Sequence, residues 1–410
     1  MKLPGTDTAL LFATRISRLF AYGLLSIVLA LYLAQIGLTD QRIGLLLSLT
    51  LAGDVAISLW ITTVADHIGR RFMLIVGAAL MILASVTFAF TDNFWLLTLA
   101  AIVGIISPSG NEIGPFLSIE QAALSQLVPS RKRTGVFAWY NLVGSFSTAL
   151  GALAGGGLIH SLQVAEVSLL AAYRAILIAY SAIGVLLVLL FACLSPAIET
   201  VRILQGASGK RLLGLHQSRK VVIHLSRLFA LDAFAGGFIV QSIMAYWFHV
   251  KFGLAPATLG SIFFGANLLA GISSLLSVRL AARIGLINTM VFTHIPSNIL
   301  LILVPLMPHA WLAILVLLLR FSISQMDVPT RQSYTMAVVC PDERSAASGV
   351  TNVARSVGAS LAPALSGQFM ALPALLGFPF FLAGGLKIVY DLLLFRDFRS
   401  LKPPEEKPLD

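Results

Sequence analysis

The sequence predicts an all-α membrane protein, with twelve transmembrane helices in two pseudo-twofold-related six-helix bundles. Three observations predict this fold: an apolar composition, apolar runs of spanning length, and an internal repeat. Of the 410 residues, 58% are hydrophobic and 11% are charged, whereas a soluble domain carries roughly 25% charged residues. A bilayer core needs about 20 apolar residues per helix. The chain therefore has room for roughly twelve spans and for no sizeable water-soluble domain.

Apolar runs of spanning length indicate six helices in each half of the chain. In the first half they cover residues 17–37, 43–65, 72–91, 94–124, 134–160 and 169–195; in the second half they cover residues 224–250, 256–281, 287–306, 309–334, 345–371 and 375–396. We expect four regions: an N-terminal bundle (1–196), a cytoplasmic linker (197–222), a C-terminal bundle (223–396) and a cytoplasmic tail (397–410).

Lysine and arginine are concentrated in the two tails, the even-numbered loops and the linker, and Arg15 and Arg18 are assigned to the N-terminal tail. Loops rich in these residues stay on the cytoplasmic side, so both termini are predicted to be cytoplasmic. The net charge of +10 follows this topology. It does not indicate a nucleic-acid surface, because the basic residues do not alternate with aromatic ones. The first apolar run has no cleavage site after it and is expected to stay as a helix. The short tails favour a cell (inner) membrane.

Two motifs of the first half recur in the second half. They are "ISRLFA" (16–21) with "LSRLFA" (225–230), and "VADHIG" (64–69) with "LAARIG" (280–285). Such duplication is typical of transporters built from two repeats. The second half therefore reads as a copy of the first, with Gly69 matching Gly285.

The duplicated halves, the basic linker and a charged glycine turn resemble the major facilitator superfamily. The turn, "TTVADHIGRR" at 62–71, is similar to that family's signature G-x-L-A-D-R-x-G-R-R, with Thr62 and His67 as departures. The resemblance implies a conformational latch on the cytoplasmic side, in which the helix dipole of helix 11 favours the carboxylate. Its residues are Asp66, Gly69, Arg70 and Arg71. The alternative is an ordinary positive-inside turn without a switching role.

A glycine-rich segment, "GALAGGG" at 151–157, resembles the G-P-x-x-G-G element of drug and proton antiporters, with Ala152 in place of proline. The resemblance favours proton-linked export, but close helix packing alone explains such glycines. We expect interface packing at Gly151, Gly155 and Gly156, and at Asp54 with Arg355 as its partner across the interface.

Ionisable side chains inside the spans are the candidates for the transport site, because each costs about 2.5 to 3.5 kcal/mol at mid-bilayer. In "SPSGNEIGPF", Asn111 and Glu112 lie among prolines and glycines that should interrupt the helix. No basic residue accompanies Glu112 in that span, so Glu112 is the first choice for the coupling proton. Arg320 or Arg331 would supply the opposing charge.

The span at 309–334 contributes Arg320, Gln325, Asp327 and Arg331. Spacings of seven and four residues put the three charges on one face of a continuous helix, so arginines should clamp Asp327. The family resemblance implies that helices 1, 4, 7 and 10 line the cavity, which adds Asp232 from helix 7.

Three further groups have simpler interpretations. Lys387 and Asp391, four residues apart, should neutralise each other. His294 is expected to be a satisfied buried histidine. The two cysteines, Cys193 and Cys340, are expected to be buried and inert, with no disulfide or metal motif.

Enzyme chemistry and ATP-driven transport lack support, because the sequence has no phosphate-binding glycine loop, no G-x-S-x-G and no paired-histidine metal motif. We expect no cofactor. The expected partners are a small-molecule substrate, protons and the lipid bilayer, and the family habit is a monomer. The leading expectation is a secondary transporter that works by rocker-switch alternating access and exports a small amphipathic or drug-like molecule in exchange for protons. Alternatives are a proton-coupled uptake symporter of a polar metabolite and a non-transporting receptor or scaffold.

Overall fold

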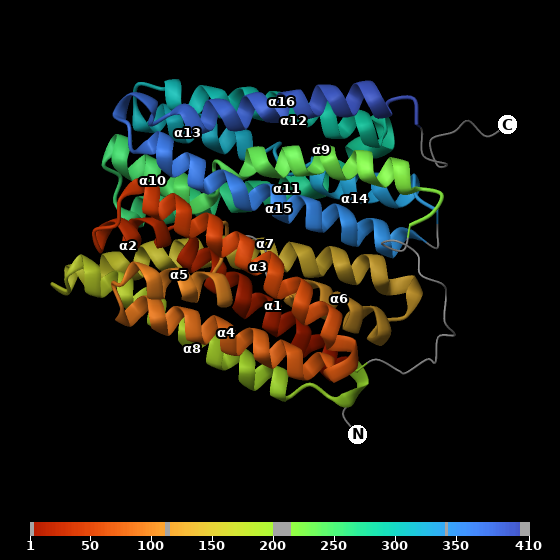
Figure 1. Cartoon of the computed structure of the whole chain (residues 1–410), viewed down its shortest axis with the longest axis horizontal. Coiled ribbons are helices and arrows are strands. Elements are labelled where there is room, and N and C mark those ends of the chain that lie inside the picture. Colours follow the sequence, from red (N-terminus) through yellow and green to blue (C-terminus); the bar gives the residue numbers. More distant parts are fainter. Residues whose placement is uncertain (1–3, 111–114, 200–214, 341–342, 402–410) are drawn as a thin grey trace. The chain divides into compact units, whose positions relative to one another are not determined.

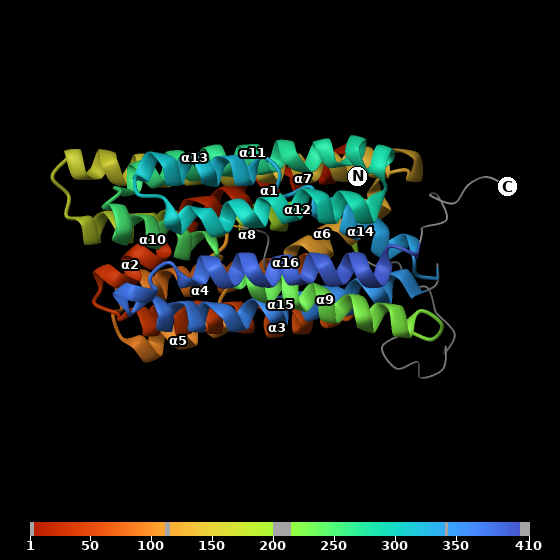
Figure 2. The same cartoon turned by 90° about the horizontal axis from the view of Figure 1, so that it is seen from above.

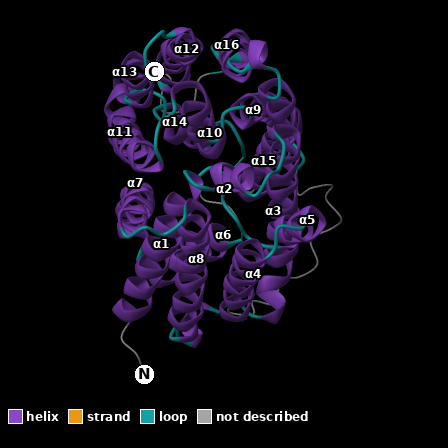
Figure 3. Ribbon diagram, turned by 90° about the vertical axis from the view of Figure 1, so that its left-hand side faces the viewer, coloured by secondary structure: helices purple, strands orange, loops and turns teal. Residues whose placement is uncertain are grey.

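The computed structural model describes residues 4–110, 115–199, 215–340 and 343–401. Within these ranges the chain forms helices, turns and bends and no strand (Figure 3). Asn111 and Glu112 lie outside the described residues, as do the side chains of Asp66 and His67.

The chain divides into two compact units. Unit 1 comprises Met1–Arg202 and Val240–Asn267, and unit 2 comprises Ile203–Ile239 and Leu268–Asp410. Residues 240–267, which the predicted bounds assign to the C-terminal bundle, thus pack with the first unit. The helices of unit 1 are α1 (Pro4–Ser26), α2 (Leu29–Gln35), α3 (Asp40–Ile68), α4 (Arg70–Phe90), α5 (Phe94–Val103), α6 (Phe116–Leu127), α7 (Ser130–Val164), α8 (Leu169–Ala192), η1 (Pro196–Ile198) and α10 (Gln241–Phe252).

Helix α11 (Pro256–Ile284) begins in unit 1 and ends in unit 2. The other helices of unit 2 are α9 (Arg219–Gly237), α12 (Leu286–Leu303), η3 (Val304–Leu306), α13 (Ala310–Phe321), α14 (Asp327–Ala337), α15 (Arg344–Met370), η5 (Pro373–Leu375) and α16 (Phe378–Phe398).

The predicted repeat is confirmed in the backbone. Helices α3 and α11 each have 29 residues, and their first and last residues are both 216 positions apart (256 − 40 and 284 − 68). A single glycine then separates each helix from the next. Gly69 has φ 126° and Gly285 has φ 87°, a region that glycine enters without steric cost. The sharp reversal therefore depends on the same residue type in both repeats.

Helix pairs inside the two units repeat in the same way. In unit 1, α1 packs on α7 and α4 on α8; in unit 2, α9 packs on α15 and α12 on α16 (Figures 1 and 2). A Cβ at Gly151 would overlap the carbonyl oxygen of Phe20, and one at Gly358 would overlap that of Ala230. Small residues thus bring α1 against α7, and α9 against α15, backbone to backbone.

Nine helices of the described residues are long and apolar enough to cross a membrane. They fall at nine of the twelve predicted spans. The other three predicted spans do not appear as single long apolar helices. The fourth span (94–124), called helix 4 below, is broken into α5 and α6, and the tenth (309–334), called helix 10 below, is broken into α13 and α14. The eleventh span (345–371) corresponds to the polar helix α15.

The predicted place of Arg15 and Arg18 in a tail and the predicted burial of the two cysteines were both wrong. Helix α1 begins at Pro4, so Arg15 and Arg18 lie within it and are 5% and 0% exposed. They do not belong to a cytoplasmic tail, because they contact polar partners inside unit 1. Hydropathy alone cannot detect such partners, so the prediction failed. Cys193 is exposed and Cys340 is partly buried, so neither is the buried thiol that we expected.

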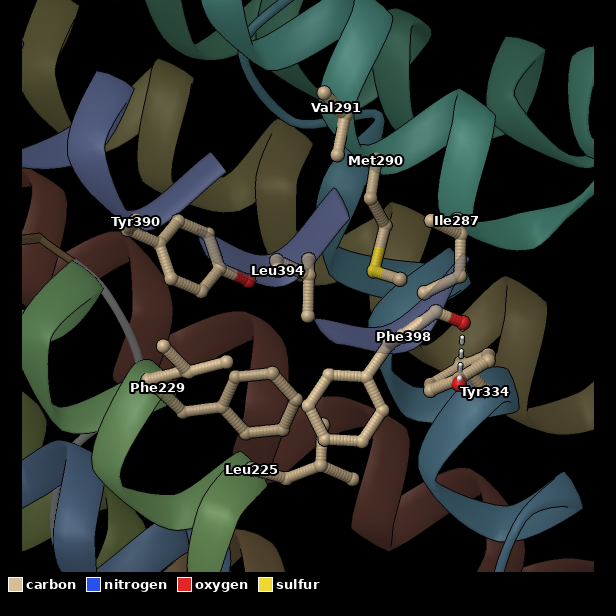
Figure 4. Close-up of a cluster of buried hydrophobic side chains, with 10 residues drawn as sticks. Leu225, Phe229, Ile287, Met290, Val291, Tyr334, Tyr390, Leu394 and Phe398 are labelled. Carbon is tan, nitrogen blue, oxygen red and sulfur yellow. Dashed lines mark hydrogen bonds between the residues drawn. The ribbon is translucent and has the colours of Figure 1, made fainter. Parts of the chain in front are cut away.

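A hydrophobic cluster joins four helices of unit 2 (Figure 4). Phe229 of α9, Met290 of α12, Tyr334 of α14 and Tyr390 of α16 belong to it, and the Tyr334 hydroxyl donates to the carbonyl of Phe398 at 3.4 Å. Three of these helices, α9, α14 and α16, also carry Asp232, Asp327 and Lys387, so the hydrophobic cluster packs together helices that bear buried charges.

Candidate functional site

Asp232 of α9 is the centre of a buried ionised cluster in unit 2. Lys387 Nζ of α16 lies 2.5 Å from Asp232 Oδ1. Arg355 Nη1 of α15 lies 3.0 Å from Asp232 Oδ2, and Arg331 Nη1 of α14 lies 3.4 Å from the same oxygen. One carboxylate therefore receives cations from three other helices, and we call these residues, together with Asp327, the Asp232 cluster.

Asp327 opens helix α14, and its Oδ2 accepts from Arg331 Nη1 at 2.8 Å. The predicted pairing of Asp327 with Arg331 is thus confirmed, and it is a four-residue helical pair. Arg331 bridges Asp327 to Asp232. The cluster therefore contains two carboxylates and three permanent cations.

The prediction that Arg320 shares one continuous helical face with Asp327 was wrong. Helix α13 ends at Phe321 and α14 begins at Asp327. Pro329 accounts for the break, because proline lacks an N–H for the carbonyl of residue 325 and its ring would meet that carbonyl in a continuous helix. Arg320 is buried in α13, with its guanidinium carbon 4.9 Å from the centre of the Phe321 ring. Gln325 lies in the break and is half-buried.

The cluster is well shielded. Asp232 is 3% exposed and Arg331 is 7% exposed, whereas the Arg355 side chain retains 28% exposure. An isolated buried charge costs several kcal/mol, and mutual pairing offsets that cost. Arg355 is the most exposed member of the cluster.

Asp391 of α16 has partners of another kind. His294 Nδ1 of α12 lies 2.8 Å from Asp391 Oδ1, and Asn298 Nδ2 lies 3.0 Å from Oδ2. His294 is a hydrogen-bonded buried histidine, as predicted. The predicted pairing of Lys387 with Asp391 was wrong, because the Lys387 side chain reaches Asp232 across to α9.

Arg355 has a partner that the sequence did not suggest. It bonds to Asp232 within its own unit, and its predicted contact with Asp54 stays a prediction. Asp54 lies on α3 of unit 1, where the Ser58 hydroxyl is 3.4 Å from its Oδ1. Local packing on α9 brings Arg355 to the nearest carboxylate.

Unit 1 contains an ion pair that sequence reasoning missed. Arg18 Nη1 and Nη2 of α1 lie 2.8 and 2.7 Å from the two carboxylate oxygens of Glu120 on α6, and both side chains are fully buried. Thr14 donates to Glu120 Oε1 at 2.8 Å, and the Tyr140 hydroxyl donates to Oε2. The only signal in the sequence was Glu120 inside the apolar span at 94–124.

The predicted interruption of helix 4 is confirmed. Helix α5 ends at Val103 and α6 begins at Phe116. The carbonyl of Pro108 accepts from the backbone N–H of Ser242 at 3.0 Å and from its hydroxyl at 2.7 Å. Ser242 also donates to the Ser26 carbonyl at 2.7 Å, and Gln241 Nε2 lies 2.7 Å from the Ser26 hydroxyl. The break after α1, the break after α5 and the first turn of α10 therefore meet in unit 1, where polar groups satisfy the freed backbone carbonyls.

Most of the predicted latch is described. The backbone N–H groups of Arg70 and Arg71 donate to the Glu199 carboxylate at 2.7 and 3.2 Å. Arg70 Nη1 lies 3.2 Å from the Ile198 carbonyl, and Arg71 Nη2 lies 2.5 Å from the Ala192 carbonyl. A carboxylate at a helix N-terminus is favoured by the helix dipole, so Glu199 caps α4 just after Gly69.

The predicted packing glycines hold α7 against its neighbours in unit 1. Gly151 and Gly155 meet α1, and a Cβ at Gly155 would lie 2.7 Å from the Leu24 carbonyl. Gly156 meets the first turn of α11, where an added Cβ would lie 2.7 Å from the Pro256 carbonyl oxygen. Within the described ranges no three His, Cys, Asp or Glu residues lie close enough together to hold a metal ion.

Comparison with known families and relatives gives a consistent result. The family model described as Major Facilitator Superfamily matches residues 11–363. The uncharacterized membrane protein YJR124C of Saccharomyces cerevisiae is 32% identical over 422 residues, covering 96% of this chain and 94% of that protein. The quinolone resistance protein NorA of Staphylococcus aureus is 27% identical over 134 residues, which is 33% of each chain.

Solved structures share the fold at low sequence identity. A mutant form of the nucleoside transporter NupG has a TM-score of 0.75 at 14% identity, covering 95% of this chain and 99% of that one. The D-xylose-proton symporter has a TM-score of 0.74 at 15% identity, covering 98% and 99%. A bacterial homologue of the human lysosomal transporter Spinster has a TM-score of 0.74 at 16% identity, covering all of both chains.

Proposed function

Because the chain belongs to the major facilitator superfamily, we propose that this transporter works by rocker-switch alternating access and exports a small amphipathic or drug-like molecule in exchange for protons. The membrane it occupies is the cell (inner) membrane, with both termini cytoplasmic, and it functions as a monomer. The transported molecule binds reversibly and no cofactor takes part.

The Asp232 cluster is the observation that carries this proposal. Burying two carboxylates and three cations on spanning helices destabilises the fold, and a protein that served only as a scaffold would not need them. Its members come from four helices, and it adjoins the break between α13 and α14. Broken helices with ionised side chains are the usual sites of substrate and ion binding in transporters.

Two observations favour export. The partial relative NorA is named for quinolone resistance, which suggests a drug-like substrate here. The glycines of α7 pack on α1 and α11, at the segment that resembles the antiporter element. The alternative is proton-coupled uptake of a polar metabolite. The three cations of the Asp232 cluster favour it, because they can hold a polar solute.

The latch is a second element of the proposed mechanism. Gly69, Arg70 and Arg71 form the turn that Glu199 caps, and we assign to Asp66 the contact that closes the outward-facing state. Asp66→Asn should insert normally and transport more slowly. Transport at the wild-type rate by the purified variant would contradict this assignment.

Reconstitution into liposomes tests the proposed function. Ethidium serves as an amphipathic probe and labelled glucose as a polar one, each with an acidic interior, an acidic exterior or no pH gradient. Export by antiport predicts that ethidium accumulates in vesicles with an acidic interior, since outward proton flow then drives the dye inward. Accumulation of glucose driven by an acidic exterior would support the alternative instead. Probe flux that is the same under all three conditions would exclude proton coupling.

Two variants test the carboxylates. Asp327→Asn and Glu112→Gln should each reduce the response to the gradient; Glu112 is the first choice from sequence for the coupling proton.

A further inference from the structure

Asp391 differs in its partners from the two carboxylates of the Asp232 cluster. Asp232 bonds to Lys387, Arg331 and Arg355, and Asp327 bonds to Arg331. Asp391 is 0% exposed, and its hydrogen bonds come from an imidazole and an amide. Its only titratable hydrogen-bond partner among the described residues is therefore His294.

A buried carboxylate without a permanent cation needs a proton or a positive partner to offset its charge. Histidine is the side chain whose charge changes between about pH 5 and 8. An imidazole that is hydrogen-bonded to a buried carboxylate is therefore a candidate site for binding and releasing one proton.

We propose that the His294–Asp391 pair binds the coupling proton, and that Lys387 exchanges between Asp232 and Asp391 as this proton binds and leaves. This inference rests on the proposed proton-coupled transport and assigns the proton to helices α12 and α16. It adds a site to those expected from sequence, which assigned the proton to Glu112.

The exchange follows from the position of Lys387. Lys387 lies one helical turn before Asp391 on α16, a spacing at which the two side chains can meet, yet its Nζ is 2.5 Å from Asp232. When the Asp232 contacts open, the ammonium group can turn to Asp391 and replace the positive charge of a protonated His294. Binding of the proton and the state of the Asp232 cluster are then linked by charge.

The pair lies among many charged groups, and each packed helix contributes. Among the described residues, the charged or titratable side chains of the helices packed around α12 and α16 that are buried or belong to the Asp232 cluster are Asp232 (α9), Arg320 (α13), Asp327, Arg331 and Tyr334 (α14), Arg355 (α15), and Lys387 and Tyr390 (α16). With a neutral imidazole, the four cations Arg320, Arg331, Arg355 and Lys387 face the three carboxylates Asp232, Asp327 and Asp391. A proton on His294 therefore adds one net positive charge, and this makes its binding sensitive to any change in the Asp232 cluster.

Polar atoms beside the pair offer a route for the proton. Ser297 Oγ and Asn298 Oδ1 are buried and have no hydrogen-bond partner among the described residues. Buried polar atoms normally bond to protein or to ordered water. These two atoms can hold water that carries the proton to His294.

The test measures proton binding directly on the purified full-length protein, with no substrate present. Nitrogen-15 NMR of histidine-labelled protein follows the imidazoles from about pH 5 to 8.5. The chain has seven histidines, and the His294 signal is assigned by its loss in His294→Gln or, if that variant does not fold, by variants of the other histidines.

We expect the His294 signal of the wild-type protein to titrate within this range. Asp391→Asn should move its midpoint by about one pH unit, which is a tenfold change in proton affinity, and Lys387→Gln should also move it. A His294 signal that does not titrate, or one unaffected by Asp391→Asn, overturns the proton site. An unchanged midpoint in Lys387→Gln overturns the exchange.

A surface pair in the same unit supplies the matched control. His224 Nε2 lies 2.9 Å from Asp397 Oδ2, with side chains 47% and 18% exposed. In liposomes, His294→Gln and Asp391→Asn should make ethidium flux independent of the pH gradient, whereas His224→Gln should keep the wild-type response. Gradient-driven flux in a protein whose His294 signal does not titrate refutes this inference and is still consistent with the proposed function. Wild-type flux that ignores the gradient refutes the coupling on which both depend.

Discussion

Arg18 and Glu120 form a bidentate ion pair with no solvent exposure, between α1 and the second piece of broken helix 4. Breaking such a pair leaves an uncompensated buried charge and costs about 3 to 5 kcal/mol. Glu120→Ala should therefore lower the thermal unfolding temperature of the detergent-purified protein markedly. Arg174 and Asp92, an exposed pair 3.0 Å apart, are the control, because Asp92→Ala should cost about 0 to 1 kcal/mol. Equal losses in the two variants would contradict the structural role of the Arg18 pair.

Substitution by alanine should have opposite effects on stability at two glycines of α7 that lie six residues apart. A Cβ at Gly151 would overlap the Phe20 carbonyl, whereas one at Gly157 meets nothing within 4 Å. Gly151→Ala should separate α1 from α7 and destabilise the protein by about 1 to 3 kcal/mol. Gly157→Ala should be neutral or stabilising by up to about 1 kcal/mol, since alanine favours the helix. Thermal unfolding of both variants in the same detergent gives the comparison, and a stable Gly151→Ala would rule out close packing at this point.

Glu343 should make the N-terminal end of α15 in unit 2 sensitive to acid. Burial opposes its ionisation, but hydrogen bonds from Ser218 and from the backbone of His216 and Ser218 outweigh burial and lower the pKa of Glu343 to about 2. Because this pKa is below its value of 4.5 in the unfolded chain, the charged carboxylate stabilises the fold above about pH 4.5, and this contribution is lost as the pH falls toward about 2.

The measurement for Glu343 compares unfolding temperatures of the wild type and Glu343→Gln as a function of pH. The wild type should be more stable at neutral pH, and the difference should shrink steadily below about pH 4.5. A difference that stays constant with pH would show that the cap does not depend on charge.

The repeated fold could be predicted from sequence because its signals are local. Apolar runs mark the spans, and the glycines at 69 and 285 mark two reversals that only a positive φ permits. The broken helix 4 also followed from its prolines and glycines. The break in helix 10 was missed, although Pro329 signals it, because charge spacing was given more weight than backbone chemistry.

Partners of buried charges could not be predicted, because they depend on packing between helices. Lys387 has a carboxylate one turn away along α16, yet it bonds to Asp232 on α9. Arg18 sits near the chain's beginning and resembles a tail residue, yet α1 places it opposite Glu120. Only the relative rotation of packed helices decides such pairs, and sequence spacing within one helix does not report that rotation.

Removing the carboxylate of Asp232 should be more harmful than removing it together with one of its cations. Asp232→Asn leaves Lys387 and Arg355 without their carboxylate partner, and an unpaired buried charge costs about 3 to 5 kcal/mol. In the double variant Asp232→Asn/Lys387→Gln one cation is also gone, so the cluster keeps Arg331 with Asp327 and less charge is left uncompensated. The double variant should therefore unfold at a higher temperature than Asp232→Asn alone.

A double-mutant cycle on unfolding temperature and on ethidium flux measures the coupling between Asp232 and Lys387. Stability should recover in the double variant while gradient-driven flux does not, because the transport cycle needs both residues. If the effects of the two single variants simply add, the 2.5 Å contact contributes nothing, and the cluster cannot link proton binding to transport.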